Sequence, residues 1–143
     1  MKIQIINGPN LNLLGKREVD IYGYQNFKDY YEKLLDEYQE INLHFFQSNI
    51  EGEIVDKIHE TGFTFQGIII NPAAYSHTSV AIADAIASVE VRVIEVHISN
   101  IFSRETYRKK TLTAEKCTGF IAGFGLESYR MALEYLIRVE PGI

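Results

Sequence analysis

The sequence predicts an α/β protein built on a doubly wound sheet of five parallel strands. Short segments rich in Ile and Val alternate along the chain with longer segments whose apolar residues recur at helical spacing. Several Ile and Val runs are continuous, which is typical of strands that helices cover on both faces. The length of 143 residues, with 46% hydrophobic and 23% charged residues, indicates a single globular domain over residues 1–143.

Five segments have the length and composition of strands. They are residues 2–7, 42–47, 67–71, 91–99 and 118–122. Because helical patterns lie between them, the crossovers join parallel strands and are expected to be right-handed. For a chain of this size we expect the flavodoxin-like strand order 2-1-3-4-5. Ligands bind such sheets at the carboxyl ends of the strands, near the switch point between the first and third strands.

The helical segments carry apolar stripes, which we interpret as core. The first stripe consists of Phe27, Tyr30, Tyr31, Leu34, Leu35 and Tyr38. The second contains Ile54, Val55 and Ile58, and it follows the candidate cap residues Ser48 and Asn49. A capped helix is therefore expected after each of the first two strands.

Three further helices are predicted in the second half of the chain. Thr78 or Ser79 is expected to cap a helix over residues 80–86. A short charged helix is expected over residues 103–108, and an amphipathic helix over residues 126–137. These complete the alternation of strands and helices.

The composition limits the classes of partner and compartment. A formal net charge of −5 disfavours a general binder of nucleic acid or of an anionic membrane. The lone Cys117 cannot form an internal disulfide, which favours a reducing cytoplasm, and we interpret it as a small core residue. Met1 leads straight into a strand without a signal peptide, and no apolar run is long enough to span a bilayer. We therefore expect a soluble cytoplasmic protein.

Glu95 and His97 are the strongest functional signal in the chain. They close an apolar strand, although an unpaired buried charge costs several kcal/mol. Side chains two residues apart on a strand point to the same face, so the carboxylate of Glu95 can orient and charge the imidazole of His97. An imidazole in this setting gives or takes a proton near neutral pH.

Two other predicted strands also end in polar clusters. Residues 7–10, with the sequence Asn-Gly-Pro-Asn, follow the first strand. Asn71, Tyr75 and His77 follow the third strand. Because the carboxyl ends of parallel strands lie at one edge of the sheet, the three clusters are expected to form one active site.

Residues 17–23, which include Arg17 and Tyr22, are expected to form an exposed and mobile loop. A guanidinium beside a phenol favours the phenolate, so the pair predicts a tyrosinate that acts as a base. Further basic side chains are candidates for a locally basic pocket; they are Arg104, Arg108, Lys109 and Lys110.

Other function classes fit the sequence poorly. The chain has neither GxxxxGK[ST] nor GxGxxG, so no phosphate loop is expected. Glu95 and His97 provide only two ligands of a metal, and we expect no metal site. A receiver domain would need acidic residues where Asn10 and Asn71 stand, and a flavin carrier would need a hydroxyl and glycine loop after the first strand. A different acid–base enzyme on the same scaffold stays open.

The chain resembles the type II 3-dehydroquinate dehydratases over essentially its whole length. The matching segments are residues 7–11, 17–18, 22–23, 47–49, 51–52, 71–79, 95–100, 104–105 and 123–125. Each segment alone is a weak signal, whereas their order and spacing together are highly specific.

The resemblance implies a hydro-lyase that reversibly removes water from 3-dehydroquinate to give 3-dehydroshikimate, in the shikimate route to aromatic amino acids. It implies an enolate intermediate, no cofactor, no metal and no covalent Schiff base. It also implies a homo-dodecamer of four trimers. Asp84, which by itself reads as a surface acid or as a residue that reaches a neighbouring chain, would enter the site of an adjacent subunit.

The resemblance also implies roles for single residues. Tyr22 would remove the proton beside the ketone, with Arg17 favouring its ionised form, and Asn10 would hold a water at the enolate oxygen. His97 would protonate the departing hydroxyl, with Glu95 orienting the imidazole. The implied substrate-binding groups are the side chains of Asn71, His77 and Arg108 at the ring hydroxyls and the backbone amides of Ile98 and Ser99 at the carboxylate.

The chain departs from the usual pattern of these dehydratases at five positions. They are Val19 in place of Pro, Ala73 in place of Gly, Ser76 in place of Thr, Ala83 in place of Arg and Phe102 in place of His. None of them removes an implied catalytic group.

Overall fold

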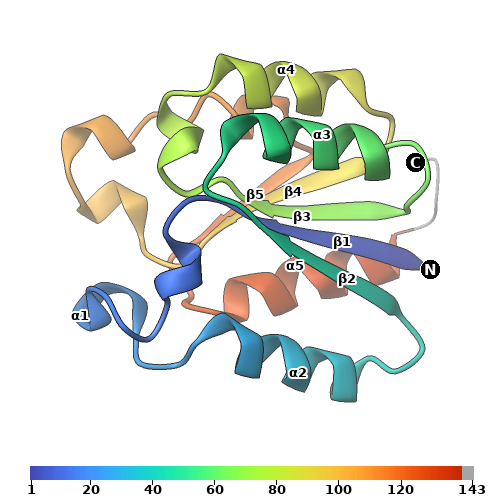
Figure 1. Cartoon of the computed structure of the whole chain (residues 1–143), viewed down its shortest axis with the longest axis horizontal. Coiled ribbons are helices and arrows are strands. Elements are labelled where there is room, and N and C mark those ends of the chain that lie inside the picture. Colours follow the sequence, from blue (N-terminus) through green and yellow to red (C-terminus); the bar gives the residue numbers. More distant parts are fainter. Residues whose placement is uncertain (140–143) are drawn as a thin grey trace.

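The computed structural model describes residues 1–139 and contains one five-stranded sheet. The strands are β1 (Lys2–Asn7), β2 (Asn42–Gln47), β3 (Gly67–Asn71), β4 (Arg92–His97) and β5 (Gly119–Ala122). Their order is β2-β1-β3-β4-β5, and every neighbouring pair is parallel. The predicted flavodoxin-like, doubly wound fold is therefore confirmed (Figure 1).

Helices separate the strands except between β4 and β5, where three 3₁₀ turns form the connection instead of the predicted helix. The helices are α1 (Val19–Tyr22), α2 (Phe27–Glu37), α3 (Glu51–Thr61), α4 (Val80–Ser88) and α5 (Glu127–Arg138). Short 3₁₀ turns occupy Leu11–Leu13, Ala73–His77, Ile101–Ser103, Thr106–Arg108 and Ala114–Lys116. None of the helices within residues 1–139 is both long and apolar enough to cross a membrane.

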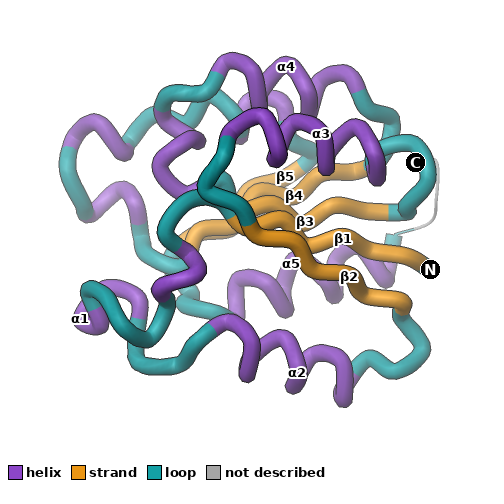
Figure 2. The backbone as a smooth tube through the Cα atoms, viewed as in Figure 1, coloured by secondary structure: helices purple, strands orange, loops and turns teal. Residues whose placement is uncertain are grey.

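Helices cover both faces of the sheet, and each face has its own core. Figures 1 and 2 show α2 and α5 below the strands and α3 and α4 above them. Successive strand residues alternate between the two cores. Ile5 and Ile69 belong to the core on the side of α2 and α5, whereas Ile6, Ile68 and Ile70 belong to the core on the side of α3 and α4. All five are fully buried, and each such side chain stabilises the fold by about 1.5–3 kcal/mol.

The N-terminal cap of one helix agrees with the prediction, and that of another differs from it. Ser79 caps α4 as expected, since its hydroxyl accepts from the Ile82 N–H at 2.9 Å. The helix α3 begins after Ile50 rather than after Ser48 or Asn49. Ser48 still supports this turn, because its hydroxyl accepts from the Ile50 N–H at 2.9 Å.

Two segments differ in secondary structure from the prediction. The expected loop over residues 17–23 contains the single helical turn α1, which ends where the Gly23 N–H donates to the Val19 carbonyl. The helix predicted over residues 103–108 is instead two 3₁₀ turns, because Arg104 between them has an extended backbone with φ −104° and ψ −159°.

The carboxyl ends of β1, β3 and β4 converge at one edge of the sheet, on the left of Figure 1. Asn7 is in register with Asn71, and Ile70 with Glu95. The ends of β1 and β3 approach closely at Gly8, whose N–H donates to the Asn71 carbonyl at 2.8 Å. A Cβ at this glycine would lie 2.5 Å from the Pro72 carbonyl oxygen, so the approach requires a residue without a side chain.

Candidate active site

A cavity of about 140 Å³ opens at this edge of the sheet. Its walls come from the segments that follow β1, β3 and β4. The lining residues are Pro9, Asn10, Leu11, Arg17, Tyr22, Asn71, Ala73, Ala74, His77, His97, Ile98, Ser99, Ile101, Arg104 and Arg108. Three arginines and no carboxylate are among them, so the cavity is suited to a small anionic ligand.

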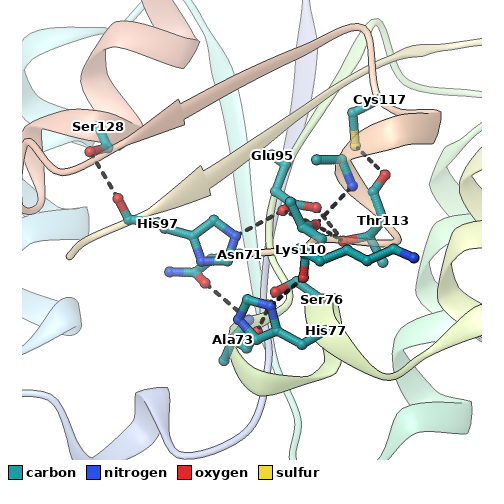
Figure 3. Close-up of polar contacts among 12 residues, drawn as sticks. Asn71, Ala73, Ser76, His77, Glu95, His97, Lys110, Thr113, Cys117 and Ser128 are labelled. Carbon is teal, nitrogen blue, oxygen red and sulfur yellow. Dashed lines mark hydrogen bonds and ion pairs between the residues drawn. The ribbon is translucent and has the colours of Figure 1, made fainter. Parts of the chain in front are cut away.

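His97 lies at the wall of this cavity and contacts the predicted carboxylate. His97 is 5% exposed and Glu95 is fully buried, and the His97 Nε2 lies 2.8 Å from Glu95 Oε2 (Figure 3). Because an ionised carboxylate only accepts hydrogen bonds, Nε2 carries a hydrogen and the second ring nitrogen is left for a ligand. The backbone of His97 is held as well, since Ser128 Oγ donates to its carbonyl at 3.2 Å.

Two threonines complete the surroundings of Glu95. Thr111 Oγ1 donates to Glu95 Oε2 at 2.8 Å, and Thr113 Oγ1 donates to Glu95 Oε1. Both carboxylate oxygens therefore accept hydrogen bonds inside the protein. Such partners offset the loss of water that makes a buried carboxylate unfavourable.

His77 faces His97 across the cavity. The two imidazole rings are stacked with centroids 6.3 Å apart, and His77 Nδ1 donates to the Lys110 carbonyl at 2.7 Å (Figure 3). Burial lowers the pKa of His77, and the neighbouring His97 and Arg108 lower it further, whereas the Lys110 carbonyl acts in the opposite direction. A neutral His77 with a fixed tautomer presents Nε2 to the cavity as an acceptor.

Tyr22 lies between two guanidinium groups. Arg104 Nη1 donates to the Tyr22 hydroxyl at 2.8 Å and to Ser99 Oγ at 3.3 Å. The guanidinium carbons of Arg17 and Arg104 lie 5.2 Å and 5.4 Å from the centroid of the Tyr22 ring. The phenol oxygen therefore accepts a hydrogen bond from a cation, and a second cation lies beside the ring.

Asn71 is held by a buried hydrogen-bond chain that links β1, β3 and α5. Its Nδ2 donates to the Tyr129 hydroxyl at 2.9 Å, and that hydroxyl donates to Asn7 Oδ1 at 2.7 Å. Asn71 Oδ1 accepts from the Ala73 N–H at 3.1 Å. Burial raises the pKa of Tyr129, so its hydroxyl stays a donor. Ala73 has φ 53°, in the region that favours glycine.

The structure brings nine of the eleven predicted site residues to the cavity wall. They are Asn10, Arg17, Tyr22, Asn71, His77, His97, Ile98, Ser99 and Arg108. Glu95 lies behind His97 rather than at the wall. Asp84 lies elsewhere, as an exposed residue on α4.

Sequence reasoning did not include Arg104, Thr111 or Thr113 among the site residues. Arg104 was only one of several basic candidates, and the pattern Thr-x-Thr carries no catalytic signature by itself. The spacing of two could have suggested hydroxyls on one side of an extended segment. The sequence does not show which carboxylate the two hydroxyls contact, because Glu95 is 16 and 18 residues away along the chain.

Neither a reactive thiol nor a metal site is found among the described residues. Cys117 is half-buried, its Sγ donates to the Thr113 carbonyl at 3.4 Å, and burial raises the pKa of its thiol, consistent with a small core residue. No group of three or more His, Cys, Asp or Glu side chains within residues 1–139 is arranged to hold a metal ion.

Comparison with known proteins relates the chain to one family. Residues 1–137 match the family described as dehydroquinase class II. A 3-dehydroquinate dehydratase of Clostridium botulinum (strain Okra / Type B1) is 53% identical over 137 residues, which cover 94% of this chain and 93% of that protein. A 3-dehydroquinate dehydratase of Campylobacter jejuni (serotype O:23/36, strain 81-176) is 55% identical over 141 residues, which cover 97% of this chain and 89% of that protein. The crystal structure of a type II dehydroquinase from Butyrivibrio crossotus DSM 2876 matches with a TM-score of 0.90 at 49% identity, covering 96% of this chain and 97% of that one.

Proposed function

The chain belongs to the class II dehydroquinase family, and from this premise we propose how its residues remove water from 3-dehydroquinate. It is a hydro-lyase of the shikimate pathway, with 3-dehydroshikimate as the product. The observation that carries the proposal is one cavity lined by both a phenol held by a guanidinium and an imidazole held by a buried carboxylate. The first pair supplies a base and the second an acid.

In the first step, the Tyr22 phenolate takes the proton from the carbon beside the ketone. The electron pair of the broken C–H bond moves into the ring and leaves negative charge on the ketone oxygen as an enolate. Arg17 and Arg104 stabilise the phenolate before this transfer. Asn10 holds a water that donates to the enolate oxygen, which is where charge develops in the transition state.

In the second step, the enolate collapses and expels the hydroxyl from the carbon next to the deprotonated one. The imidazolium of His97 gives its proton to this hydroxyl, which leaves as water, and a double bond conjugated to the ketone forms. Hydroxide is a poor leaving group, so the acid is needed. Glu95 fixes the ring through Nε2 and balances its positive charge.

Substrate binding uses the rest of the cavity. Asn71, His77 and Arg108 hydrogen-bond to the ring hydroxyls, and the backbone amides of Ile98 and Ser99 receive the carboxylate. The proposal is supported by the position of all five at the cavity wall. The anchoring of Asn71 by Tyr129 and of His77 by the Lys110 carbonyl presents both side chains in fixed orientations.

The same family membership is the basis for the proposed compartment, cofactor requirement and assembly. We take residues 1–143 as a single catalytic domain that works in the cytoplasm without a cofactor or a metal, and with neither nucleic acid nor a membrane as a partner. Twelve copies assemble as four trimers, and Asp84 reaches the site of a neighbouring subunit. The exposure of Asp84 on α4, away from the cavity of its own chain, supports this last point.

Turnover of 3-dehydroquinate by the purified protein tests the proposal. The reaction is followed by the ultraviolet absorbance of the conjugated product, with borohydride and a chelator added in parallel samples. We expect turnover that neither addition affects, since no imine and no metal take part. Inactivation by borohydride or by the chelator would contradict the proposed chemistry, and absence of turnover in correctly assembled protein would contradict the function itself.

A further inference from the structure

The segment of residues 110–114 contacts both histidines of the site, one directly and one through Glu95. The Lys110 carbonyl accepts from His77 Nδ1 at 2.7 Å, and the Leu112 N–H donates to the Ser76 carbonyl at 2.7 Å. In the same segment, the hydroxyl of Thr111 donates to one oxygen of Glu95. The hydroxyl of Thr113 donates to the other (Figure 3). An otherwise irregular segment is thereby tied to β4 and to the turn after β3.

The two hydroxyls are themselves fixed in direction. Thr111 Oγ1 accepts from the Ala114 N–H at 3.1 Å, which leaves its own hydrogen for Glu95 Oε2. Thr113 is fully buried, and its hydroxyl is directed to Glu95 Oε1. Neither threonine lines the cavity, so neither is in a position to contact the substrate.

We propose that Thr111 and Thr113 are positioning residues that hold Glu95 ionised and oriented, so that the proton of the pair resides on His97. This inference rests on the proposed roles of Glu95 and His97. A carboxylate that accepts two hydroxyl hydrogen bonds is stabilised as an anion, and it then competes less strongly for the imidazole proton. The imidazole then keeps its Nε2 hydrogen and one ring orientation, and the proton on its other ring nitrogen is the one given to the departing hydroxyl.

The direction of the effect distinguishes this role from simple packing. Without a threonine hydroxyl, the carboxylate is less stabilised by the protein and holds the proton shared with His97 more tightly. The pair then loses its proton at higher pH and is a weaker acid at neutral pH. Removing the charge by Glu95→Gln has the opposite effect, because the imidazolium loses its counter-ion and deprotonates at lower pH.

The test compares Thr113→Val, which keeps the shape and removes the hydroxyl, with Thr113→Ser, which keeps the hydroxyl. We expect Thr113→Val to lower kcat by about 10- to 100-fold, the usual effect of losing a hydrogen bond to a charged group, with KM nearly unchanged, and Thr113→Ser to retain most of the activity. The alkaline limb of the kcat–pH profile moves to higher pH in Thr113→Val and to lower pH in Glu95→Gln. Thr61→Val is the matched control, because Thr61 is also buried and its hydroxyl donates within α3 to the Lys57 carbonyl.

A second readout does not depend on turnover. Diethyl pyrocarbonate reacts with the neutral imidazole of a histidine and not with its imidazolium, and mass spectrometry of the peptide that contains His97 gives the pH midpoint of this reaction. We expect this midpoint to rise in Thr113→Val and to fall in Glu95→Gln. If Thr113→Val fails to assemble, Thr111→Val removes the other donor and has to move the midpoint in the same direction.

The outcomes distinguish the positioning role of the threonines from the proposed function of the enzyme. Unchanged kcat and an unchanged midpoint in the threonine variants, together with a strong loss in Glu95→Gln, would overturn the positioning role and leave the proposed function intact. If the unaltered protein shows no turnover, the proposed function fails. The midpoints would then still decide whether the threonines control the proton on His97.

Discussion

Each proposed acid–base group of the site lies next to a side chain of complementary chemistry. Tyr22 receives a hydrogen bond from Arg104, and His97 gives one to Glu95. In the proposed mechanism the two pairs have opposite requirements, since the phenol loses its proton and the imidazole holds one. Two guanidinium groups lie beside the phenol, and a buried carboxylate lies beside the imidazole, within one cavity.

Replacing His97 tests the acid at the scale of a single residue. We expect His97→Ala to lower kcat by about 10²- to 10⁴-fold, the usual contribution of general acid catalysis. The fold is retained, because Thr111 and Thr113 still donate to Glu95. Circular dichroism and size-exclusion chromatography check the fold and assembly, and His59→Ala on the exposed face of α3 is the control. Near-normal turnover of His97→Ala would exclude His97 as the acid.

The lowered pKa of His77 makes the stability of the protein depend on pH. As the pH falls below the ordinary value of 6.5, the unfolded chain binds the proton more readily than the folded protein does. The free energy of unfolding therefore decreases with falling pH, and His77 contributes to this decrease. His77→Asn keeps a donor for the Lys110 carbonyl but does not titrate.

The expected result is a smaller loss of stability for His77→Asn than for the unaltered protein between neutral pH and a pH below 6.5. Urea unfolding at the two pH values measures this difference. Equal losses in the two proteins would show that His77 binds its proton equally well in the folded and unfolded states.

At the scale of secondary structure elements, the site depends on the close approach of β1 and β3. Gly8 allows this approach, since its backbone contacts those of Asn71 and Pro72. The approach brings Asn10, in the segment after β1, and Asn71, the last residue of β3, to the same cavity. The helical turn α1 then brings Tyr22 to the cavity from a part of the chain that precedes α2.

Gly8→Ala tests this arrangement. The added Cβ would lie 2.5 Å from the Pro72 carbonyl oxygen and 2.8 Å from its carbon, so the two strand ends must separate. We expect a loss of about 1–3 kcal/mol in the free energy of unfolding, together with lower kcat/KM. Gly52→Ala is the matched control: nothing lies within 4 Å of its Cβ on α3, so it should stabilise the protein by about 0.5–1 kcal/mol. A Gly8→Ala protein as stable as the unaltered one would contradict the steric argument.

At the scale of the whole molecule, the proposed trimer makes a direct prediction for Asp84. If each site takes Tyr22 from one subunit and Asp84 from its neighbour, two inactive variants can complement each other. Mixed trimers of Tyr22→Phe and Asp84→Ala, refolded together in equal amounts, contain sites with both residues intact. Random assembly predicts recovery of about one quarter of the unaltered activity.

The separately refolded variants, mixed afterwards, are the control for this experiment. They should show no recovery, because their subunits have already assembled. Equal activities in the refolded mixture and in this control would place Asp84 outside the neighbouring site. The readout does not require the number of trimers in the assembly to be known.

The sequence by itself determined the fold and the contact between Glu95 and His97 at the end of β4. Continuous Ile and Val runs such as residues 68–70 predict buried parallel strands, because only strands covered on both faces are apolar throughout. The spacing of Glu95 and His97 predicted their contact, since alternate strand residues share a face, and the 2.8 Å distance confirms it. These inferences depend on local periodicity, which a sequence contains directly.

Only the tertiary structure decided which distant groups complete these pairs. Arg104 reaches Tyr22 across 82 positions, and Tyr129 reaches Asn7 across 122. Thr111 and Thr113 meet Glu95 because the segment after the 3₁₀ turn of Thr106–Arg108 folds back over the end of β4. Such contacts follow from how strands and helices pack, and no local pattern of residues specifies them. The helix α1 escaped prediction for a different reason, because its single turn is too short to show helical periodicity.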